Sequence, residues 1–546
     1  MRSHLRWIAP ALVLGIAAAL RFWALGRPGT LVFDELFYVR DAISQLAHGF
    51  PTVWPDDDPS MAGERATAYT DAPANAVHPP LGKWIIGLGV LAFGPGNGWG
   101  WRSAGALAGV LAAAVTMRLA WRMSRSLVVA CIAGLLLAID GVHVVLSRVG
   151  LLDGPLTLLV VLGALCFWRD IEADGGDAGR GGARGRDGTQ GRGGARGRGV
   201  AAAEGSAEGA AENSTEGERG TPVPLRWRRP WLLAAAAAFG AATAVKWSGL
   251  YPLAAFLILV TMRDLAIRLR GGERRAVRRA AAQAGLTAAI ALPTAAVVYL
   301  SSWAGWIATS GGWGRGAGPN WFVSLVRSHA EMWSWHSTLS APHPFRAHPV
   351  TWPLALRPTA MYELRWTEGC PWADCVAGIS PLPNPLVTWG GAAALLVLGA
   401  LVARRAWETR RGAPDPLVLV GAFVVLGYLS GWLPWMLTFS RSAVFQFYAV
   451  VLTPFSAIAL ALLLGMLCGV PIRTRAGRAA ELGALRDPVT GRALPREPAA
   501  YEAGRRSVGV FLAVALVLAV LFFPVWSGMP VAGWFWDAHL WLPGWD

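Results

Sequence analysis

Lysine and cysteine are both scarce in this chain of 546 residues. Only two of its 49 basic residues are Lys, namely Lys83 and Lys246, and it has five Cys. Charged residues make up 15% of the chain, whereas 54% of its residues are hydrophobic and the mean hydropathy is +0.41. Ordinary soluble domains have about 25% charged residues. The composition therefore excludes an ordinary soluble multidomain protein and indicates that the bilayer is the solvent.

Long apolar segments recur along the chain, and a membrane-spanning helix needs about 20 mainly apolar residues. Eleven segments of that size lie near 7–26, 102–121, 126–142, 150–168, 230–245, 249–266, 281–303, 386–403, 416–435, 442–468 and 507–526. Residues 36–47 and 81–93 are apolar but too short to span, so we expect them to lie along the membrane interface as amphipathic helices. The predicted fold is an all-α polytopic membrane protein.

Arginine is distributed unevenly among the loops between these spans. By the positive-inside rule the Arg-rich segments lie in the cytoplasm, and they are 2–6, 118–125, 169–229, 263–279, 404–411 and 473–506. The net charge of +15 therefore reflects topology and does not indicate a nucleic-acid partner. An odd number of spans predicts a multi-pass protein of the cell membrane with a cytoplasmic N-terminus and an extracytoplasmic C-terminus.

The predicted topology also sets the organisation of the chain. Its parts are an N-terminal transmembrane module at 1–168 with an external loop at 27–101, a cytoplasmic linker at 169–229, transmembrane helices at 230–303, an external loop at 304–385, C-terminal transmembrane helices at 386–526 with a cytoplasmic loop at 472–506, and an external tail at 527–546. Residues 171–220 have almost no large apolar side chains, so we expect disorder there. RGG-like repeats can bind RNA, but a dispensable insertion is the simpler interpretation.

The second long external loop contains many tryptophans and two of the cysteines. Nine Trp lie between 303 and 372, where an interfacial belt is the simpler interpretation and a sugar-stacking platform the alternative. Cys370 and Cys375 share this loop, and an oxidising environment permits a disulfide between them. No ordered His spacing accompanies the pair, which disfavours a metal site.

Two motifs in the first external loop contain residue types suited to chemistry. Asp34 and Glu35 are adjacent carboxylates directly after the first predicted span, and a helix-end cap is the structural alternative to a catalytic role. The string HPPLGK at 78–83 is more specific, because its prolines fix the backbone and start a helix that presents His78 and Lys83 near its beginning.

Further cations lie at the predicted outer ends of helices, namely Arg102, Arg148, Lys246 and Arg441. A single charge at a membrane boundary usually snorkels and means little. As a group, however, these cations oppose the positive-inside bias, and both lysines of the chain lie at such outside positions. An anionic group is therefore their natural partner.

These motifs, in this order, resemble those of the protein O-mannosyltransferase family. The resemblance extends nearly from end to end and rests on Phe33-Asp34-Glu35, the 78–83 string, Arg102, Ser147-Arg148, Leu151-Leu152-Asp153, Lys246-Trp247-Ser248-Gly249, Arg357-Pro358 with Tyr362, Pro434-Trp435, Phe447-Tyr448-Ala449 and Trp541-Leu542-Pro543. The chain lacks the β-trefoil insertion of eukaryotic members, so it looks bacterial and actinobacterial. The linker at 171–220 has no counterpart in the family pattern.

The resemblance implies a GT-C membrane glycosyltransferase fold and a polyprenyl phosphate mannose donor. The implied acceptors are Ser or Thr hydroxyls of secreted proteins, reached near the translocon on the extracytoplasmic face. The implied reaction is metal-independent and uses no cofactor. Membrane lipid is expected around the protein, and no nucleic acid.

The residues supply a mechanism for such a transfer. A lipid phosphate leaves without a general acid, but its developing negative charge must be met by cations. The candidate phosphate-binding residues are His78, Lys83, Arg102, Arg148, Lys246 and Arg441. A single displacement with inversion needs one base, for which we predict Asp34, while Glu35 orients Asp34 or the peptide.

Two other functions fit parts of this pattern. A GT-C enzyme that passes sugar to a lipid or cell-wall glycan shares the carboxylate, the cations and the topology, but the HPPLGK string and the terminal Trp-Leu-Pro favour a protein acceptor. A secondary transporter is the non-enzyme alternative. Transporters place charges near the midplane and often contain inverted repeats, whereas here the charges gather at one face.

Overall fold

A computed structural model of the chain describes residues 2–75, 77–184, 223–340, 342–410, 415–438, 441–470 and 498–545. The helices are α1 (Arg2–Phe22), α2 (Glu35–His48), α3 (Leu81–Phe93), α4 (Gly98–Ser124), α5 (Leu127–Ala138), α6 (Gly141–Arg148), α7 (Asp153–Arg184), α8 (Pro230–Val245), α9 (Leu250–Arg270), α10 (Ala276–Ser301), α11 (Ala304–Ala308), α12 (Trp321–Thr338), α13 (Pro385–Glu408), α14 (Pro416–Met436), α15 (Thr453–Leu467), α16 (Pro498–Ser527) and α17 (Gly533–Asp537). Short 3-10 turns lie at η1 (Gly63–Thr67), η3 (Trp247–Gly249), η4 (Pro349–Leu354) and η5 (Gln446–Leu452).

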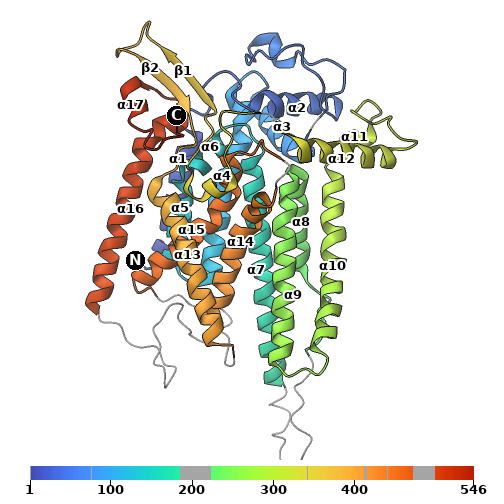
Figure 1. The fold of residues 1–546 in the computed structure, drawn as a ribbon, viewed down its shortest axis with the longest axis vertical. Coiled ribbons are helices and arrows are strands. Elements are labelled where there is room, and N and C mark those ends of the chain that lie inside the picture. The colour runs from blue at the N-terminus through green and yellow to red at the C-terminus, as the bar shows by residue number, and fades with distance from the viewer. Residues whose placement is uncertain are drawn as a thin grey trace, which may run out of the picture.

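The long helices form one bundle, in which α7, α8, α9 and α10 run side by side (Figure 1). Every one of the eleven predicted spans coincides with a helix. Seven helices of the described chain are long and apolar enough to cross a membrane, and the α5–α6 pair, bent by 60°, makes an eighth candidate. The multi-pass helical fold is thus confirmed, while the count of eleven spans stays a prediction.

Small residues let the central helices approach one another closely. Helix α8 is rich in Ala and packs between α7 and α10. A Cβ on Gly240 of α8 would lie 2.6 Å from the carbonyl oxygen of Ala295 on α10, and a Cβ on Gly163 of α7 would lie 2.6 Å from the Phe239 ring. Small residues at helix contacts are typical of membrane bundles, where close van der Waals packing replaces the hydrophobic drive.

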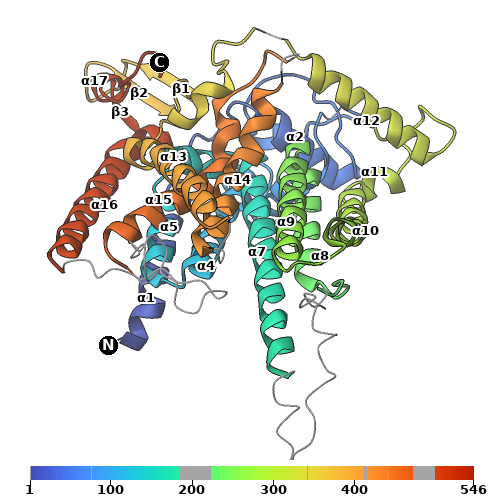
Figure 2. The same cartoon turned by 60° about the horizontal axis from the view of Figure 1, so that its bottom comes forward.

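The upper end of the bundle in Figure 1 contains the segments that the sequence predicts to be external. Segments 36–47 and 81–93 are helical, as predicted, and form α2 and α3, which pack on each other. Helices α11 and α12 lie across the end of α10 (Figures 1 and 2). The N-terminus and the C-terminus lie at opposite ends of the bundle (Figure 2).

A small three-stranded sheet, which the sequence did not predict, accompanies the predicted helical fold. Strands β1 (Tyr362–Trp366), β2 (Cys375–Ile379) and β3 (Pro530–Ala532) pair antiparallel in that order, with Trp366 opposite Cys375 and Cys375 opposite Ala532. The structure joins Cys370 to Cys375 by a disulfide across the β1–β2 turn. The strands were missed because each is only three to five residues long and β3 comes from the distant tail.

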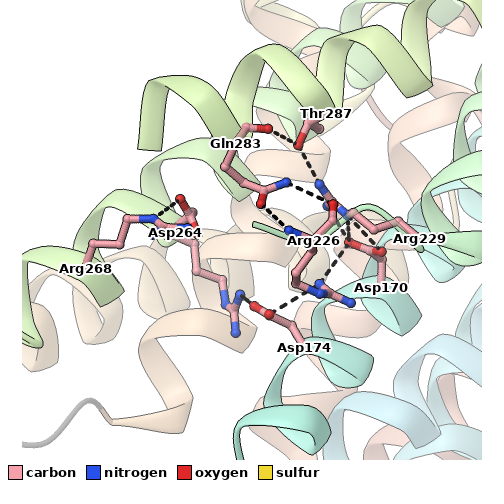
Figure 3. Close-up of polar contacts among 9 residues, drawn as sticks. Asp170, Asp174, Arg226, Arg229, Asp264, Arg268, Gln283 and Thr287 are labelled. Atoms are coloured by element: carbon pink, nitrogen blue, oxygen red, sulfur yellow. Dashed lines mark hydrogen bonds and ion pairs between the residues drawn. The ribbon is translucent and has the colours of Figure 1, made fainter. Parts of the chain in front are cut away.

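A cluster of Arg and Asp residues ties the helices together at the opposite end (Figure 3). Asp170 of α7 accepts from Nε of Arg229 at 3.3 and 3.2 Å, and Asp174 pairs with Nη1 of Arg226 at 3.3 Å. Arg229 also donates to Thr287 of α10, and the Arg226 backbone amide donates to Gln283 at 2.8 Å. Asp170 is 17 residues from Asp153, so the cluster lies about 25 Å along α7 from the other end of that helix.

This cluster corrects the predicted boundaries of the linker. Helix α7 continues to Arg184, well past residue 168, and residues 223–229 are part of the ordered structure. The sequence prediction placed residues 169–229 in the linker and expected disorder at 171–220, where large apolar side chains are almost absent. Ion pairs and hydrogen bonds provide the stabilisation instead. Residues 185–222, the centre of the predicted linker, lie outside the described residues.

Replacement of Asp170 by Asn is expected to destabilise the protein. The change leaves the buried Arg229 guanidinium without its counter-ion, and breaking a buried pair in this way costs about 3–5 kcal/mol. Glu408→Gln is the matched control, because its partner Arg404 lies on an exposed helix end and exposed pairs contribute about 0–1 kcal/mol. Thermal unfolding in detergent measures both variants. Equal midpoints for the two would contradict a stabilising role for the cluster.

Candidate functional site

A cavity of about 310 Å³ opens between the ends of α7, α9, α14 and helix α12. One part of its lining is polar and includes His78, Asp153, Lys246, His336, Arg441 and Tyr448. The other part is apolar and includes Leu156, Val160, Pro252, Leu437 and Val451. A cavity with cationic and apolar walls fits a ligand with a charged head and a hydrocarbon tail.

The turn that presents Asp34 is strained and firmly held. Phe33 has a φ of +49°, a left-handed conformation that costs a bulky residue about 1–3 kcal/mol. Directly after this turn Glu35 is fully buried, and its carboxylate accepts hydrogen bonds from the backbone amides of Val32 at 2.9 Å and Gly150 at 2.6 Å. Glu35 therefore ties the chain just before the catalytic candidate Asp34 to the segment that follows α6.

Arg102 completes this arrangement from α4. Its Nε and Nη2 atoms donate to the two oxygens of Glu35, each at 2.7 Å, a bidentate geometry typical of strong Arg–carboxylate pairs. The remaining donors bind the carbonyl oxygens of Leu25, Pro28 and Thr30, in the chain segment that leads from α1 to the turn. Glu35 and Arg102 thus neutralise each other inside the fold.

Asp34 lies beside the cavity and interacts with two of the side chains that line it. Burial raises the pKa of Asp34 to about 6; the Lys246 ammonium opposes this rise and the Asp153 carboxylate adds to it. A carboxylate with a pKa near neutrality is suited to accept a proton at physiological pH.

Lys246 is the cation next to Asp34, at the junction of α8 and η3. Its Nζ atom lies 2.7 Å from Oδ2 of Asp153, the first residue of α7. The ammonium also lies 5.9 Å from the ring centroid of Tyr38 and 5.3 Å from that of Tyr448, so aromatic faces surround it.

Arg441 is the second cation that lines the cavity, and it shares the neighbour Tyr448 with Lys246. Its Nε donates to the carbonyl oxygen of Ala443 at 2.8 Å and its Nη2 to the hydroxyl of Tyr448 at 3.1 Å. Its Nη1 lies 3.2 Å from Nδ1 of His336 on α12. No carboxylate within the described part of the chain forms an ion pair with Arg441, so its charge is available to an anion.

The HPPLGK string contributes one residue to the cavity wall and one to its support. His78 lines the cavity, and burial together with the Lys246 charge holds its pKa well below the ordinary value, so the ring is neutral near pH 7. Lys83 is buried, 3.1 Å from Oδ2 of Asp41, and donates to the carbonyl oxygen of His78 at 3.1 Å. Lys83 therefore holds the turn that presents His78.

The structure separates the six predicted phosphate-binding residues into two groups. His78, Lys246 and Arg441 line the cavity. Lys83 and Arg102 have carboxylate partners, and Arg148 donates to the carbonyl oxygens of Leu20 and Arg21 at the end of α1, at 2.9 and 3.1 Å. The sequence could not separate these groups, because a carboxylate partner distant in the chain leaves no local signal.

His336 is a cavity residue that the sequence analysis missed. It lies on α12, inside the second predicted external loop, which the sequence analysis interpreted through its tryptophans and cysteines. Leu325, His329, Met332 and His336 follow at intervals of four, three and four residues, the spacing of one helical face. That pattern was available in the sequence and would have pointed to His336.

Two protein-family models match the chain. Residues 11–174 match "Dolichyl-phosphate-mannose-protein mannosyltransferase", and residues 321–545 match "C-terminal four TMM region of protein-O-mannosyltransferase". A relative from Mycolicibacterium smegmatis and one from Mycobacterium tuberculosis are each 30% identical over 99% of this chain, covering 93% and 92% of their own lengths. Both are named polyprenol-phosphate-mannose–protein mannosyltransferase.

A solved structure shares the fold. The S. cerevisiae protein O-mannosyltransferase Pmt1-Pmt2 complex bound to the sugar donor superposes with a TM-score of 0.67 at 14% identity, over 99% of this chain and 92% of that one. The helical bundle with its site at one end is that of a GT-C membrane glycosyltransferase. Within this class, the chain belongs to the protein O-mannosyltransferase family.

Asp34→Asn is expected to lower the turnover number by about a hundred- to ten-thousandfold, because the amide keeps the shape but cannot take a proton. In the wild-type enzyme, kcat/KM is expected to fall about tenfold per pH unit below pH 6, since the raised pKa of about 6 leaves Asp34 protonated there.

Transfer rates between pH 4.5 and 8, measured beside donor affinity, test both statements. Asp57→Asn is the control, because that side chain is exposed on the same loop. Near wild-type turnover in Asp34→Asn would remove Asp34 from the mechanism and direct attention to Asp153.

Proposed function

We propose that this protein transfers mannose from polyprenyl phosphate mannose to Ser or Thr hydroxyls of proteins, with Asp34 as the base. The observation that carries this proposal is the position of Asp34, with its raised pKa, beside a cavity that is lined by both cations and apolar side chains. The named relatives support the donor and the protein acceptor.

The proposed reaction is a single displacement. The acceptor hydroxyl oxygen attacks the anomeric carbon of mannose as its proton passes to Asp34, and the bond from that carbon to the phosphate oxygen breaks with its electron pair. Polyprenyl phosphate leaves, and the configuration at the anomeric carbon inverts. If Asp34 were already protonated, it could not accept the proton of the acceptor hydroxyl, and the hydroxyl would remain a poor nucleophile.

Lys246 and Arg441 are the residues we assign to the donor phosphate. Both line the cavity and approach it from different elements. Lys246 already pairs with Asp153, so an incoming phosphate would share the ammonium with that carboxylate. These two cations meet the charge of the leaving group, and we propose that no metal ion or cofactor is required.

In this proposal Glu35, Arg102 and Lys83 do not contact the substrates but support the residues that do. Glu35 and Arg102 hold the strained turn of Asp34, and Lys83 holds the carbonyl oxygen of His78. Their removal would move the catalytic groups, because a buried charge loses its partner in each case.

A transfer assay tests the proposed activity. Purified enzyme with polyprenyl phosphate [14C]mannose and a Thr-rich peptide is expected to give labelled peptide at the same rate with and without EDTA. Two parallel acceptors, a peptide with Ala at every Thr and Ser position and a lipid-linked glycan, are expected to stay unlabelled. Label on the glycan and none on the peptide would identify the enzyme as a different GT-C transferase.

The proposed location is the cell membrane, with the cavity on the extracytoplasmic face and the N-terminus in the cytoplasm. There the enzyme would meet secreted proteins as they leave the translocon. The Arg-rich segments support this orientation, because such segments usually lie on the cytoplasmic side of a membrane.

Reporter fusions test the orientation. Fusions after Trp545 are expected to report an extracytoplasmic location and fusions within 185–215 a cytoplasmic one. A cytoplasmic signal after Trp545 would place the cavity on the wrong face for secreted acceptors.

A further inference from the structure

Helix α12 is the part of the second external loop that lines the donor cavity. Leu325 and Met332 on one face of this helix are buried in a small apolar cluster with Phe50, Trp303 and Trp306, and His329 and His336 lie on the same face. His336 stacks on the ring of His78 with centroids 4.9 Å apart, and Trp247 packs against both histidines of α12.

The hydrogen bonds of His336 fix which ring nitrogen carries the proton. Nε2 lies 2.6 Å from the carbonyl oxygen of Val77, and a carbonyl oxygen can only accept, so Nε2 bears the hydrogen. Nδ1 lies 3.2 Å from Nη1 of Arg441, and a guanidinium can only donate, so Nδ1 offers its lone pair. Both partners therefore require the same neutral tautomer.

Three hydrogen bonds to neighbouring protein groups hold the Arg441 guanidinium. A guanidinium has five N–H groups. One on Nε binds Ala443, one on Nη2 binds Tyr448 and one on Nη1 binds His336. Two N–H groups remain, one on each terminal nitrogen, without a partner among the described residues. Such a pair suits bidentate binding of a phosphate.

We propose that His336 is a positioning residue that orients the Arg441 guanidinium for the donor phosphate, so that α12 is a functional part of the donor site. The inference rests on the proposed function, since it takes Arg441 to bind the phosphate. His336 acts through Arg441, because both of its ring nitrogens are already engaged by protein groups. The external loop thereby determines how tightly the enzyme holds its lipid-linked donor.

Two substitutions separate the two hydrogen bonds of His336. The side-chain amide of Asn occupies the position of Nδ1, so His336→Asn keeps an acceptor for Arg441 and loses the contact with Val77. The amide of Gln reaches the position of Nε2, so His336→Gln keeps the contact with Val77 and loses the acceptor.

Donor binding is measured by equilibrium binding of polyprenyl phosphate [14C]mannose to the full-length enzyme in nanodiscs, without acceptor. The proposal predicts that His336→Gln weakens binding about ten- to hundredfold, the range for one hydrogen bond to a charged group, and that His336→Asn binds within a few-fold of wild type. Similar affinities for the two variants, or the reverse order, would overturn the proposal. His348→Gln is the matched control, an exposed histidine of the same loop outside the cavity.

A double-variant cycle distinguishes positioning from a structural or direct role. His336→Ala is expected to weaken donor binding in the wild-type background and to have no further effect in the Arg441→Ala background. Further weakening there would overturn the proposal, because His336 would then act without Arg441. Unchanged binding in Arg441→Ala alone would instead refute the phosphate site itself. Unfolding midpoints show whether each variant is folded.

Discussion

The buried ion pair between Glu35 and Arg102 holds together the part of the fold on which the site depends. It is bidentate, and its two members also bind backbone groups before the Asp34 turn and at Gly150 after α6. Removing either partner would leave an uncompensated buried charge. The pair thus helps to maintain the left-handed conformation of Phe33, and with it the position of Asp34 beside the cavity.

Pairing of charge also explains how a site for an anion arises among so many cations. Lys83, Arg102 and Arg148 are bound by carboxylates or carbonyl oxygens and stabilise the scaffold. Arg441 has only neutral partners among the described residues, and Lys246 shares the cavity with Asp153. The arginine–aspartate cluster around Asp170 satisfies its charges in the same way at the other end of the bundle. Of the six residues predicted to bind the phosphate, only Lys246, Arg441 and the neutral His78 therefore face the cavity.

The sequence predicted the features that depend on local pattern. Hydropathy located a helix at every predicted span, and motif order identified the family and the Asp34-Glu35 pair. It could not predict features that depend on distant partners. These include the pairing of Arg102 with Glu35, the joining of β3 to β2, the ordered ends of the linker around Asp170 and Arg229, and the approach of His336 to Arg441. The helical face of α12 that carries His336 could have been predicted, because Leu325, His329, Met332 and His336 follow one another at helical spacing in the sequence.

A structure of the enzyme with polyprenyl phosphate mannose tests the central claim most directly. The account predicts the phosphate within hydrogen-bonding distance of Lys246 or Arg441, the tail along Leu156 and Val160, and the anomeric carbon facing the space next to Asp34. A phosphate bound instead at Arg102 or Arg148, with Glu35 displaced from its partner, would contradict the division of the cations on which this account rests.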